Sequence, residues 1–366
     1  MSEILKKTTG TMVAFGDAVQ LSKERSQDPE ADGFDRYIGL EHLEPSDLKV
    51  RSWGDIADGT TFTNVFRPGQ VLFGKRRAYQ RKVAVADFSG VCSGDIYVLE
   101  PKADHLLPEL LPFICQSEPF YDYVISMSQG GLSPRVNWKA LIKYEFALPP
   151  LEEQRRIAEV MMALEKTFSL FVTCKVAGES VLSSLLLSII STPDKRSSEV
   201  RVGELLDLKY GKGLPETNRD GGQYAVYGSS GIAGHHSQKL VDGPVIIVGR
   251  KGSAGAVVWC NESCWPIDTT FWVKNKSSLP YKLVYFLLKG LELPRFAEQT
   301  AMPGLDRNRV HEVRLSKQAV DEPEVTLSRL NIVEEAIVSV QKRIEAILQV
   351  KRALLASSLT QGERSV

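Results

Sequence analysis

This chain of 366 residues contains an internal repeat of two copies. Each copy consists of a polar globular stretch followed by a long segment with a heptad pattern of apolar residues. The repeated strings are Arg67-Pro-Gly-Gln-Val-Leu-Phe-Gly74 with Asp242-Gly-Pro-Val-Ile-Ile-Val-Gly249, Ser93-Gly-Asp95 with Pro266-Ile-Asp268, and Gly131-Leu132 with Gly304-Leu305. A chain made of two copies is expected to fold with a pseudo-twofold relation. It can therefore present two surfaces that are related but differ in their side chains.

Both heptad segments predict long helices that pack on each other. Apolar residues recur at alternating steps of four and three, which is the a/d pattern of a coiled coil. The first seam is Ile157, Met161, Leu164, Phe168, Phe171, Lys175, Gly178, Leu182, Leu185 and Ile189, and the second is Leu330, Val333, Ile337, Val340, Ile344, Ile347, Lys351, Leu354 and Ser358. Two seams in one chain most economically pair with each other, in antiparallel orientation if the globular parts lie at opposite ends.

The globular stretches have the pattern of short strands separated by turns. Alternating apolar runs at 71–73, 83–85 and 96–99 recur in the second copy at 245–248, 256–259 and 270–273. Apolar spacing predicts a helix at 108–127 and another at 281–288. We therefore predict an α+β fold in which two long helices, forming an antiparallel coiled coil, join two globular domains. The predicted parts are a first domain at 1–150, a central spacer helix at 151–192, a second domain at 193–322 and a C-terminal spacer helix at 323–366.

Composition is that of an ordinary soluble protein. Hydrophobic residues make up 43% of the chain and charged residues 25%. The most apolar run, 181–190, is too short to span a bilayer, and the N-terminal MSEILKKTTG lacks the apolar core of a secretion signal. The five scattered cysteines suit a reduced compartment better than a disulfide framework. We therefore expect a cytoplasmic protein.

One pair of cysteines raises the question of a metal site. Cys260 and Cys264 lie downstream of His235-His236, but a zinc site needs four ligands at a familiar spacing. Trp259 and Trp265 adjoin the two cysteines, which favours buried thiols. We expect no metal in this chain.

The charge of the chain is balanced overall but uneven locally. Its 45 basic and 45 acidic residues argue against a purely electrostatic binder of nucleic acid. The stretch 67–82 nevertheless contains only basic charges, and Phe73 and Tyr79 lie among them. A solvated face is the usual explanation of such a cluster, but the interleaved aromatic residues favour contact with phosphates or bases.

The most specific string marks the start of the first long helix. It reads Pro149-Pro150-Leu151-Glu152-Glu153-Gln154-Arg155-Arg156-Ile157-Ala158, and prolines followed by acidic residues suit a helix start. The string resembles the start of the central helix in specificity subunits of type I restriction-modification systems. Gln129-Gly-Gly131-Leu132-Ser133 and Tyr227-Gly-Ser-Ser-Gly-Ile-Ala-Gly234 are similar to parts of that family's target recognition domains. The resemblance covers almost the whole chain in the order domain, helix, domain, helix.

The resemblance implies a DNA-reading subunit without catalysis of its own. Each globular domain would read one half of an asymmetric bipartite site in double-stranded DNA, and the coiled coil would set the gap. A helix of about 38 residues is roughly 55–60 Å long, which exceeds the roughly 34 Å of one duplex turn. The implied partners are two adenine methyltransferase subunits, which would hold S-adenosylmethionine, and motor-nuclease restriction subunits. The candidate partner contacts are Leu151, Gln154 and Ile157.

No catalytic residue is predicted in this chain. It lacks the Asn-Pro-Pro-Tyr string of adenine methyltransferases and the phosphate-binding loop of nucleoside triphosphatases. Asp268 has no neighbouring carboxylate that would suggest a nuclease site, so a turn or a cap is its expected role. A nuclease therefore ranks last among the possible functions. A coiled-coil scaffold whose globular ends bind protein or carbohydrate is the alternative that the zero net charge leaves open.

Candidate DNA contacts are side chains that can reach base edges or phosphates. Arginine and lysine suit guanine, and asparagine and glutamine suit adenine. In the first domain they are Lys75, Arg76, Arg77, Tyr79, Arg81, Gln129, Arg135 and Asn137. In the second they are Tyr227, Ser230, His235, Arg250, Lys251, Ser253, Arg307, Asn308 and Arg309. Matching positions differ in chemistry, so the two half-sites are expected to differ.

Overall fold

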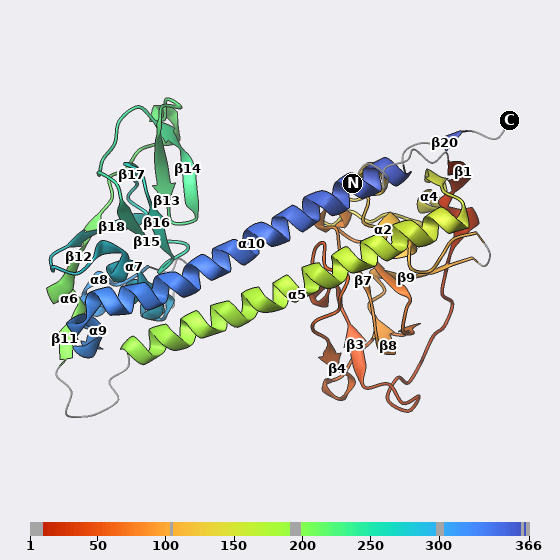
Figure 1. Cartoon of the computed structure of the whole chain (residues 1–366), viewed down its shortest axis with the longest axis horizontal. Helices are drawn as coiled ribbons and strands as arrows, with labels where there is room; N and C mark the ends of the chain where they lie inside the picture. The colour runs from red at the N-terminus through yellow and green to blue at the C-terminus, as the bar shows by residue number, and fades with distance from the viewer. Residues whose placement is uncertain (1–9, 103–104, 191–198, 298–303, 360–361, 364–366) are drawn as a thin grey trace. The chain divides into compact units, whose positions relative to one another are not determined.

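The structure is a computed structural model that describes residues 10–102, 105–190, 199–297, 304–359 and 362–363 (Figure 1). The chain divides into two compact units. Unit 1 comprises Met1–Thr173 and Val340–Val366, and unit 2 comprises Cys174–Ser339. Each unit therefore contains one globular part and one half of each long helix.

The two long helices start at the predicted residues. Helix α5 is Leu151–Ile190 and helix α10 is Pro323–Leu359. The prediction of helix as far as residue 366 is wrong, because Gly362–Glu363 (β20) is a strand that pairs in parallel with β1 (Gly10–Ala14). Residues 191–192, 360–361 and 364–366 of the predicted helices lie outside the described residues.

Every predicted seam residue is buried or half-buried. In unit 1 the Lys351 ammonium lies 2.5 Å from the Glu165 carboxylate, and the side chain of Lys351 is only 5% exposed. In unit 2 Gly178 leaves room for Ile337, whose Cγ1 would lie 2.9 Å from a Cβ at that position. Residue 165 of α5 faces residue 351 of α10, and residue 178 faces residue 337, so the two helices run antiparallel. Gly178 and Lys351, which interrupt the apolar heptad pattern, thus contact Ile337 and Glu165 across the helix pair.

The main sheets of the two units have the same strand order. In unit 1 it is β2 (Val19–Leu21), β9 (Ile96–Pro101), β6 (Val71–Gly74) and β7 (Val83–Val85), and in unit 2 it is β12 (Leu206–Tyr210), β18 (Thr270–Asn275), β15 (Val245–Gly249) and β16 (Val257–Cys260). All six pairings are antiparallel. A two-stranded pairing also recurs, as β1 with β10 (Glu145–Leu148) and β11 (Glu199–Arg201) with β19 (Arg314–Ser316). The internal repeat is therefore confirmed in the topology.

The copies differ in a second, smaller sheet. In unit 1 its order is β4 (Gly54–Asp55), β3 (Arg36–Ile38), β8 (Gly90–Cys92) and β5 (Asn64–Phe66), and in unit 2 it is β14 (Gly231–His236), β13 (Tyr224–Gly228) and β17 (Trp265–Pro266). Each contains one parallel pair, β3 with β8 and β13 with β17. Within the part of the chain that the structure describes, the three-stranded sheet has no counterpart of β5. Divergence between the copies is thus concentrated in this sheet and the loops around it.

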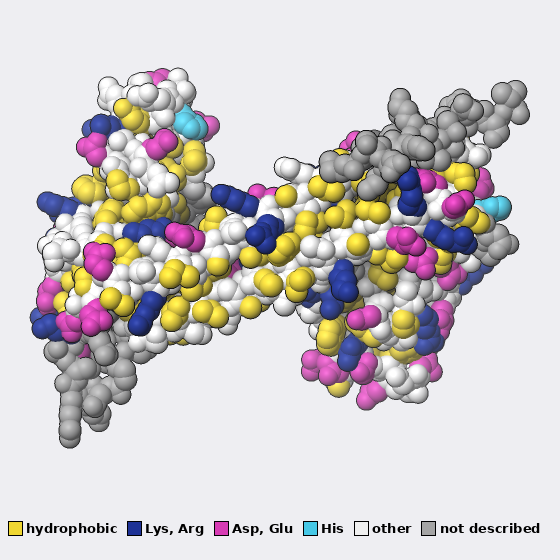
Figure 2. All heavy atoms as spheres, in the orientation of Figure 1, with side chains coloured by type: hydrophobic (Ala, Val, Ile, Leu, Met, Phe, Trp, Pro, Cys, Tyr) yellow, Lys and Arg dark blue, Asp and Glu magenta, His cyan; other side chains and the backbone are white. Residues whose placement is uncertain are grey.

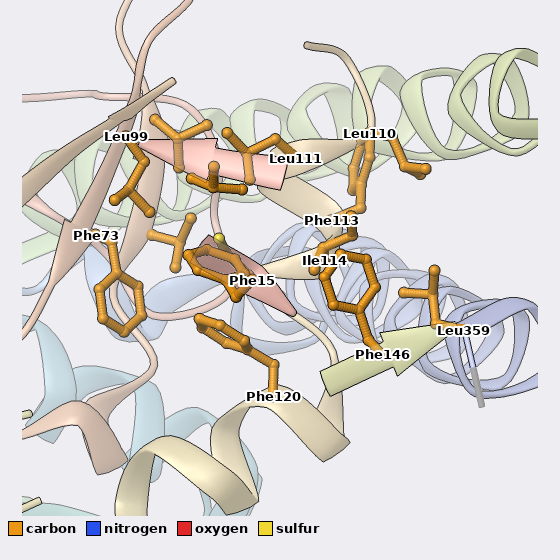
Figure 3. Packing of buried hydrophobic residues seen from close by; sticks show 14 of the residues in the cluster. Phe15, Phe73, Leu99, Leu110, Leu111, Phe113, Ile114, Phe120, Phe146 and Leu359 are labelled. Carbon is orange, nitrogen blue, oxygen red and sulfur yellow. The ribbon is translucent and has the colours of Figure 1, made fainter. Parts of the chain in front are cut away.

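The predicted helix at 108–127 is split in two. The pieces are α2 (Leu111–Ile114) and α3 (Glu118–Ser126), because Ser117 between them has an extended backbone and Pro119 follows in the first turn of α3. The other predicted helix is α7 (Tyr281–Gly290). Phe120 of α3 lies in the core of unit 1, with ring centroids 5.3 Å from Phe15 and 5.6 Å from Phe73 (Figure 3). Edge-to-face and tilted contacts of this kind stabilise a core beyond the area that they bury.

Two of the three predicted partner contacts are used inside unit 1. The Gln154 amide is 1% exposed; it accepts a hydrogen bond from the backbone N–H of Leu107 at 2.9 Å and donates to two carbonyl groups. Ile157 belongs to the buried core cluster. Both predictions are corrected, since neither side chain reaches the surface. Leu151 is 39% exposed.

Helix α5 carries apolar side chains outside the seam as well as in it. Met162, Leu170, Val181 and Leu187 are exposed, and Figure 2 shows hydrophobic side chains along the long helices. Over its most apolar 18 residues the mean hydropathy is 1.5, so α5 is long and apolar enough to cross a membrane by these two criteria alone. The apolar run 181–190 is still too short by itself, and one such helix is weak evidence for a membrane span. The seam explains only part of the apolar content of α5.

Candidate nucleic-acid interface

Two predicted DNA-contacting segments of unit 1 meet in one surface. The backbone N–H of Arg77 donates to the Pro134 carbonyl at 2.7 Å, and that of Val136 donates to the Lys75 carbonyl at 3.0 Å. Arg135 forms isolated bridges with both Arg76 and Gln129. The loop after β6 and the loop before α4 (Trp138–Leu141) are therefore held edge to edge.

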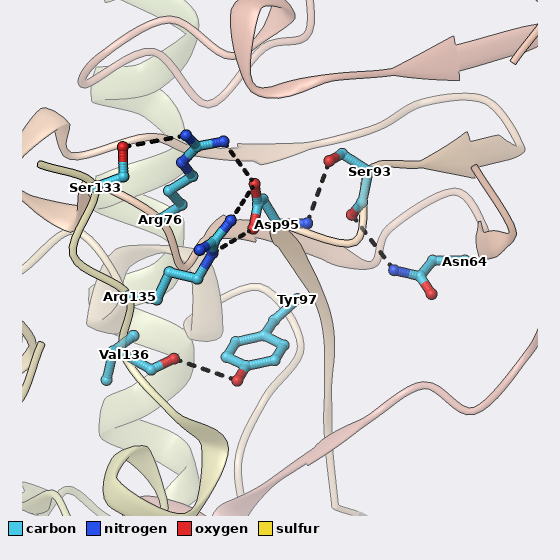
Figure 4. A network of polar contacts seen from close by, with 8 residues as sticks. All are labelled: Asn64, Arg76, Ser93, Asp95, Tyr97, Ser133, Arg135 and Val136. Atoms are coloured by element: carbon cyan, nitrogen blue, oxygen red, sulfur yellow. Dashed lines mark hydrogen bonds and ion pairs between the residues drawn. The ribbon is translucent and has the colours of Figure 1, made fainter. Parts of the chain in front are cut away.

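Asp95 holds the two arginines of this surface (Figure 4). Arg135 donates from Nε to Oδ1 at 2.8 Å and from Nη2 to Oδ2 at 3.4 Å, while Arg76 donates from Nη1 to Oδ2 at 3.2 Å. Arg76 also donates from Nη2 to the Ser133 hydroxyl at 3.1 Å. Burial opposes ionisation of Asp95, but the hydrogen bonds from Arg135 and Arg76 outweigh it, and the pKa of Asp95 is lowered. Asp95 is thus an anion shared by two cations.

The remaining cations of unit 1 have different surroundings. The Lys75 ammonium lies 4.6 Å from the centre of the Tyr97 ring, and burial lowers the pKa of Lys75. Arg81 is used inside the unit, because it donates from both terminal nitrogens to the Glu118 carboxylate at 2.5 Å each. This bidentate pair engages both terminal nitrogens of Arg81, and its contact with DNA stays a prediction. Tyr79, Gln129 and Asn137 are exposed.

In unit 2 two of the three predicted arginines converge on a tyrosine. The guanidinium carbons of Arg250 and Arg307 lie 5.0 and 5.1 Å from the centre of the Tyr210 ring, which is half exposed. Arg250 donates from Nη1 to the Asp268 carbonyl at 2.6 Å, and Arg307 donates from Nη1 to the Leu208 carbonyl at 3.4 Å. An aromatic face orients a guanidinium without neutralising its charge.

The strand register shifts the predicted correspondence between the copies by one residue. Gly74 pairs with Ile96 in unit 1, and Gly249 pairs with Thr270 in unit 2. Thr269, and not Asp268, therefore takes the place of Asp95. The Leu305 N–H donates to the Arg250 carbonyl at 2.8 Å, just as the Val136 N–H donates to the Lys75 carbonyl in unit 1. Leu305 therefore corresponds to Val136, and the predicted match of Gly131-Leu132 with Gly304-Leu305 is also wrong. Unit 2 has no carboxylate at the position that holds the arginines of unit 1.

Other predicted residues of unit 2 lie around the same loops. Ser230, Lys251, Ser253, Asn308 and Arg309 are exposed. Lys251 forms a bridge with Gly304, and a Cβ at Gly252 would lie 3.3 Å from the Ser229 hydroxyl, so the loop after β15 adjoins the β13–β14 turn. His235 is exposed on β14, opposite Ala225.

Tyr227 is half-buried in unit 2. It packs against a cluster that contains the buried thiols of Cys260 and Cys264, as predicted for these two cysteines. Burial and the hydrogen bond with Cys260 raise the pKa of Tyr227 to about 12. Tyr227 is only half-buried, so its contact with DNA stays a prediction.

Helix α8 (Arg307–Glu312) presents three predicted residues and is fixed at both ends. At its start the Asp306 carboxylate accepts hydrogen bonds from the backbone N–H groups of Asn308 and Arg309, at 2.8 and 3.3 Å. Near its end the backbone N–H of Leu208 donates to His311 Nε2 at 3.2 Å. That hydrogen bond requires a neutral imidazole nitrogen.

Acidification is expected to destabilise unit 2 through His311. Burial lowers the pKa of His311 below its ordinary value, although Asp207 opposes this effect. The unfolded chain therefore takes up a proton more readily than the folded chain. The stability that His311 contributes is fully present above its ordinary pKa and is lost as the pH falls from that pKa to the lower pKa of the folded state. We expect the melting temperature to fall between about pH 7.5 and about pH 5.5, and to fall less in a His311→Gln variant, whose amide oxygen can still accept. An unchanged slope in the variant would assign the effect to other groups.

Comparison with known proteins finds relatives of the first copy. Residues 22–172 match the family described as type I restriction modification DNA specificity domain. This part of the chain is therefore similar to a type I DNA specificity domain. The type I restriction enzyme EcoDI specificity subunit of Escherichia coli is 30% identical to it over 143 residues, which cover 36% of this chain and 30% of that subunit. The aligned region thus spans less than a third of that relative, and the resemblance noted in the sequence is confirmed.

Solved structures extend the similarity of the fold to the whole chain. The type I restriction-modification S subunit from M. genitalium has a TM-score of 0.62 at 14% identity, covering 96% of each chain. A chain from a study of complex assembly and conformational transition of the type I R-M system has a TM-score of 0.53 at 19% identity, covering 96% of this chain and 98% of that one. The predicted fold, with two globular domains and two long antiparallel helices, is confirmed.

Three side chains of the interface escaped the sequence analysis. Asp95 was visible as part of a repeated string, but nothing local indicated its two arginine partners. Ser133 lies in a string used only as a family marker. Tyr210 precedes the glycines of Gly211-Lys-Gly213, and an aromatic residue beside such a turn could have marked it as a candidate contact. The structure shows that its ring is half exposed.

Proposed function

We propose that this chain is the DNA-recognition subunit of a type I restriction-modification complex. The globular part of each unit reads one half of a bipartite asymmetric site, and the paired helices set the spacing. One observation carries the proposal: the two copies share a sheet topology but present different polar clusters at matching loops. Two arginines held by Asp95 and two arginines stacked on Tyr210 are different base-reading surfaces.

The proposed subunit is not an enzyme and works through its partners. Methylation would come from two adenine methyltransferase subunits that hold S-adenosylmethionine, and restriction from motor-nuclease subunits. The exposed apolar side chains of the long helices offer these proteins a docking surface, including Leu151, Met162 and Leu170 of α5 and Ile332 and Val338 of α10. Apolar side chains that remain exposed on a soluble protein commonly mark an interaction site.

Mapping of methylated adenines tests the proposal directly. The genomes of cells that carry the partner methyltransferase are compared with and without this chain. One bipartite motif is expected to be methylated only when the chain is present. The absence of any motif that depends on the chain would refute the proposal and favour the coiled-coil scaffold.

The assembled complex is also expected to bind DNA with a steep dependence on salt. Neutralised phosphates release counterions, so affinity falls with salt in proportion to the number of phosphate contacts. Lys251→Glu, at an exposed position of the interface, should weaken binding and reduce the slope of log K against log salt by roughly one. Lys274→Glu makes the same charge change at an exposed position near the C-terminal end of β18. This variant should leave the affinity and the salt slope unchanged. Equal effects of the two variants would argue against a located interface.

A further inference from the structure

We infer that Arg135 reads a guanine in the half-site of unit 1 and that Asp95 is its positioning residue. This inference rests on the proposed function and deepens it, because it assigns one base to one side chain. The assignment comes from how the hydrogen-bonding edges of the arginines around Asp95 are used.

Arg135 has one edge bound and the other available. Its Nε and Nη2 donate to the two oxygens of Asp95, which occupies the side edge of the guanidinium. The side chain is 49% exposed, and among the described residues no partner is recorded for Nη1. The two terminal nitrogens can together donate to O6 and N7 of guanine, the pair of acceptors that arginine recognises in the major groove. The bonds to Asp95 therefore leave Nη1 and the second N–H of Nη2 available for a base.

Arg76 has a supporting role in the same cluster. Its Nη1 and Nη2 are bound to Asp95 and Ser133, and its Nε is buried without a recorded partner among the described residues. Little of its donor capacity remains for a base. It contributes a second positive charge that keeps Asp95 ionised, as the lowered pKa of Asp95 indicates.

Asp95 is itself well fixed. It lies at the turn before β9, where its backbone N–H donates to the Ser93 hydroxyl at 3.2 Å and its carbonyl accepts from the Lys75 N–H at 3.0 Å. A guanidinium held by such a carboxylate loses little rotational freedom on binding, which favours a directional contact. The carboxylate also cancels part of the positive charge, which weakens a phosphate contact relative to a base contact. Both effects point to base readout.

The test uses the full chain assembled with its methyltransferase partner and a duplex carrying the mapped motif. Each guanine of the unit 1 half-site is replaced in turn by 7-deazaguanine, which lacks the N7 acceptor but still pairs with cytosine. One position is expected to lower the affinity of the wild-type complex by roughly tenfold to a hundredfold. The Arg135→Ala complex should bind more weakly and should be insensitive to the replacement at that position.

Two further variants separate reading from positioning. Arg135→Lys keeps a charge that suffices for a phosphate, but its ammonium lacks the rigid pair of donors of the guanidinium, so discrimination at that guanine should be weakened. Asp95→Asn should relax discrimination at the same position, while the exposed control Asp58→Asn should not. Melting temperatures of all variants identify any that fail to fold, and Arg135→Lys then carries the test.

The outcomes distinguish this inference from the proposed function. If the wild-type complex binds no specific sequence, the proposed function fails. If it binds a bipartite site but Arg135→Lys keeps full discrimination at every guanine, the assignment of Arg135 is wrong. If Arg135 variants relax a guanine and Asp95→Asn does not, the positioning role of Asp95 is wrong. If the Arg135 variants lose base discrimination in the half-site read by unit 2, the inference is also overturned.

Discussion

Replacement of Lys351 by alanine is expected to lower the free energy of unfolding of unit 1 by about 3–5 kcal/mol. The Lys351 ammonium is 2.5 Å from the Glu165 carboxylate, and the two side chains are only 5% and 16% exposed. Glu165 also accepts a hydrogen bond from the Leu48 N–H at 3.3 Å. Removal of the lysine would leave a largely buried carboxylate without its counter-charge, which is more destabilising than the loss of the whole pair.

A double replacement provides the control for this prediction. Lys351→Met combined with Glu165→Leu removes both charges and keeps apolar volume at the seam, so it should recover much of the lost stability. Urea unfolding followed by circular dichroism gives the free energies. A loss below about 1 kcal/mol for Lys351→Ala would show that the pair behaves like an exposed surface ion pair.

Gln154→Ala is expected to destabilise unit 1 by roughly 2–4 kcal/mol, because a buried amide with all its hydrogen bonds made would be lost. Gln154 joins the first turn of α5 to the preceding loop through the Leu107 N–H and the carbonyls of His105 and Pro149. Without the side chain, these backbone groups lose their partners. Measurement of urea unfolding tests the prediction.

Two other variants sharpen the test of Gln154. Gln154→Glu should be at least as harmful, because a carboxylate cannot donate to the two carbonyls that the Gln154 amide contacts at 2.8 Å each. Arg155→Ala changes an exposed neighbour on the same helix and should stay within about 0.5 kcal/mol of the wild type. Equal effects of Gln154→Ala and Arg155→Ala would contradict the structural role of Gln154.

Local patterns predicted the elements of the fold well. The prolines and acidic residues before Gln154 marked the start of α5, and the heptad steps identified a seam in which every member is buried or half-buried. These features depend on residues close together in the chain, so the sequence displays them directly. The split between α2 and α3 was missed because Ser117 and Pro119 interrupt the helix without interrupting its apolar face.

Contacts between distant residues were not predictable in the same way. Arg81 and Glu118, or Arg135 and Asp95, are paired only because strands and loops bring them together. A one-residue error in aligning the copies matched Asp95 with Asp268 and concealed that Thr269 stands in its place. Side chains on neighbouring residues of a strand point to opposite faces, so an error of one residue is enough to reverse an interpretation.

The parallel pairing of β20 with β1 also bears on how such a chain can be rearranged. Gly10 and Gly362 are register partners in one sheet of unit 1, so a short connection would join these two points of the backbone. A chain closed there would be a ring of two repeats, and it could be reopened between other elements without a change of topology. The order in which the two globular parts occur along the polypeptide is therefore not dictated by the fold, and gene rearrangements that exchange or permute them should still give folded proteins.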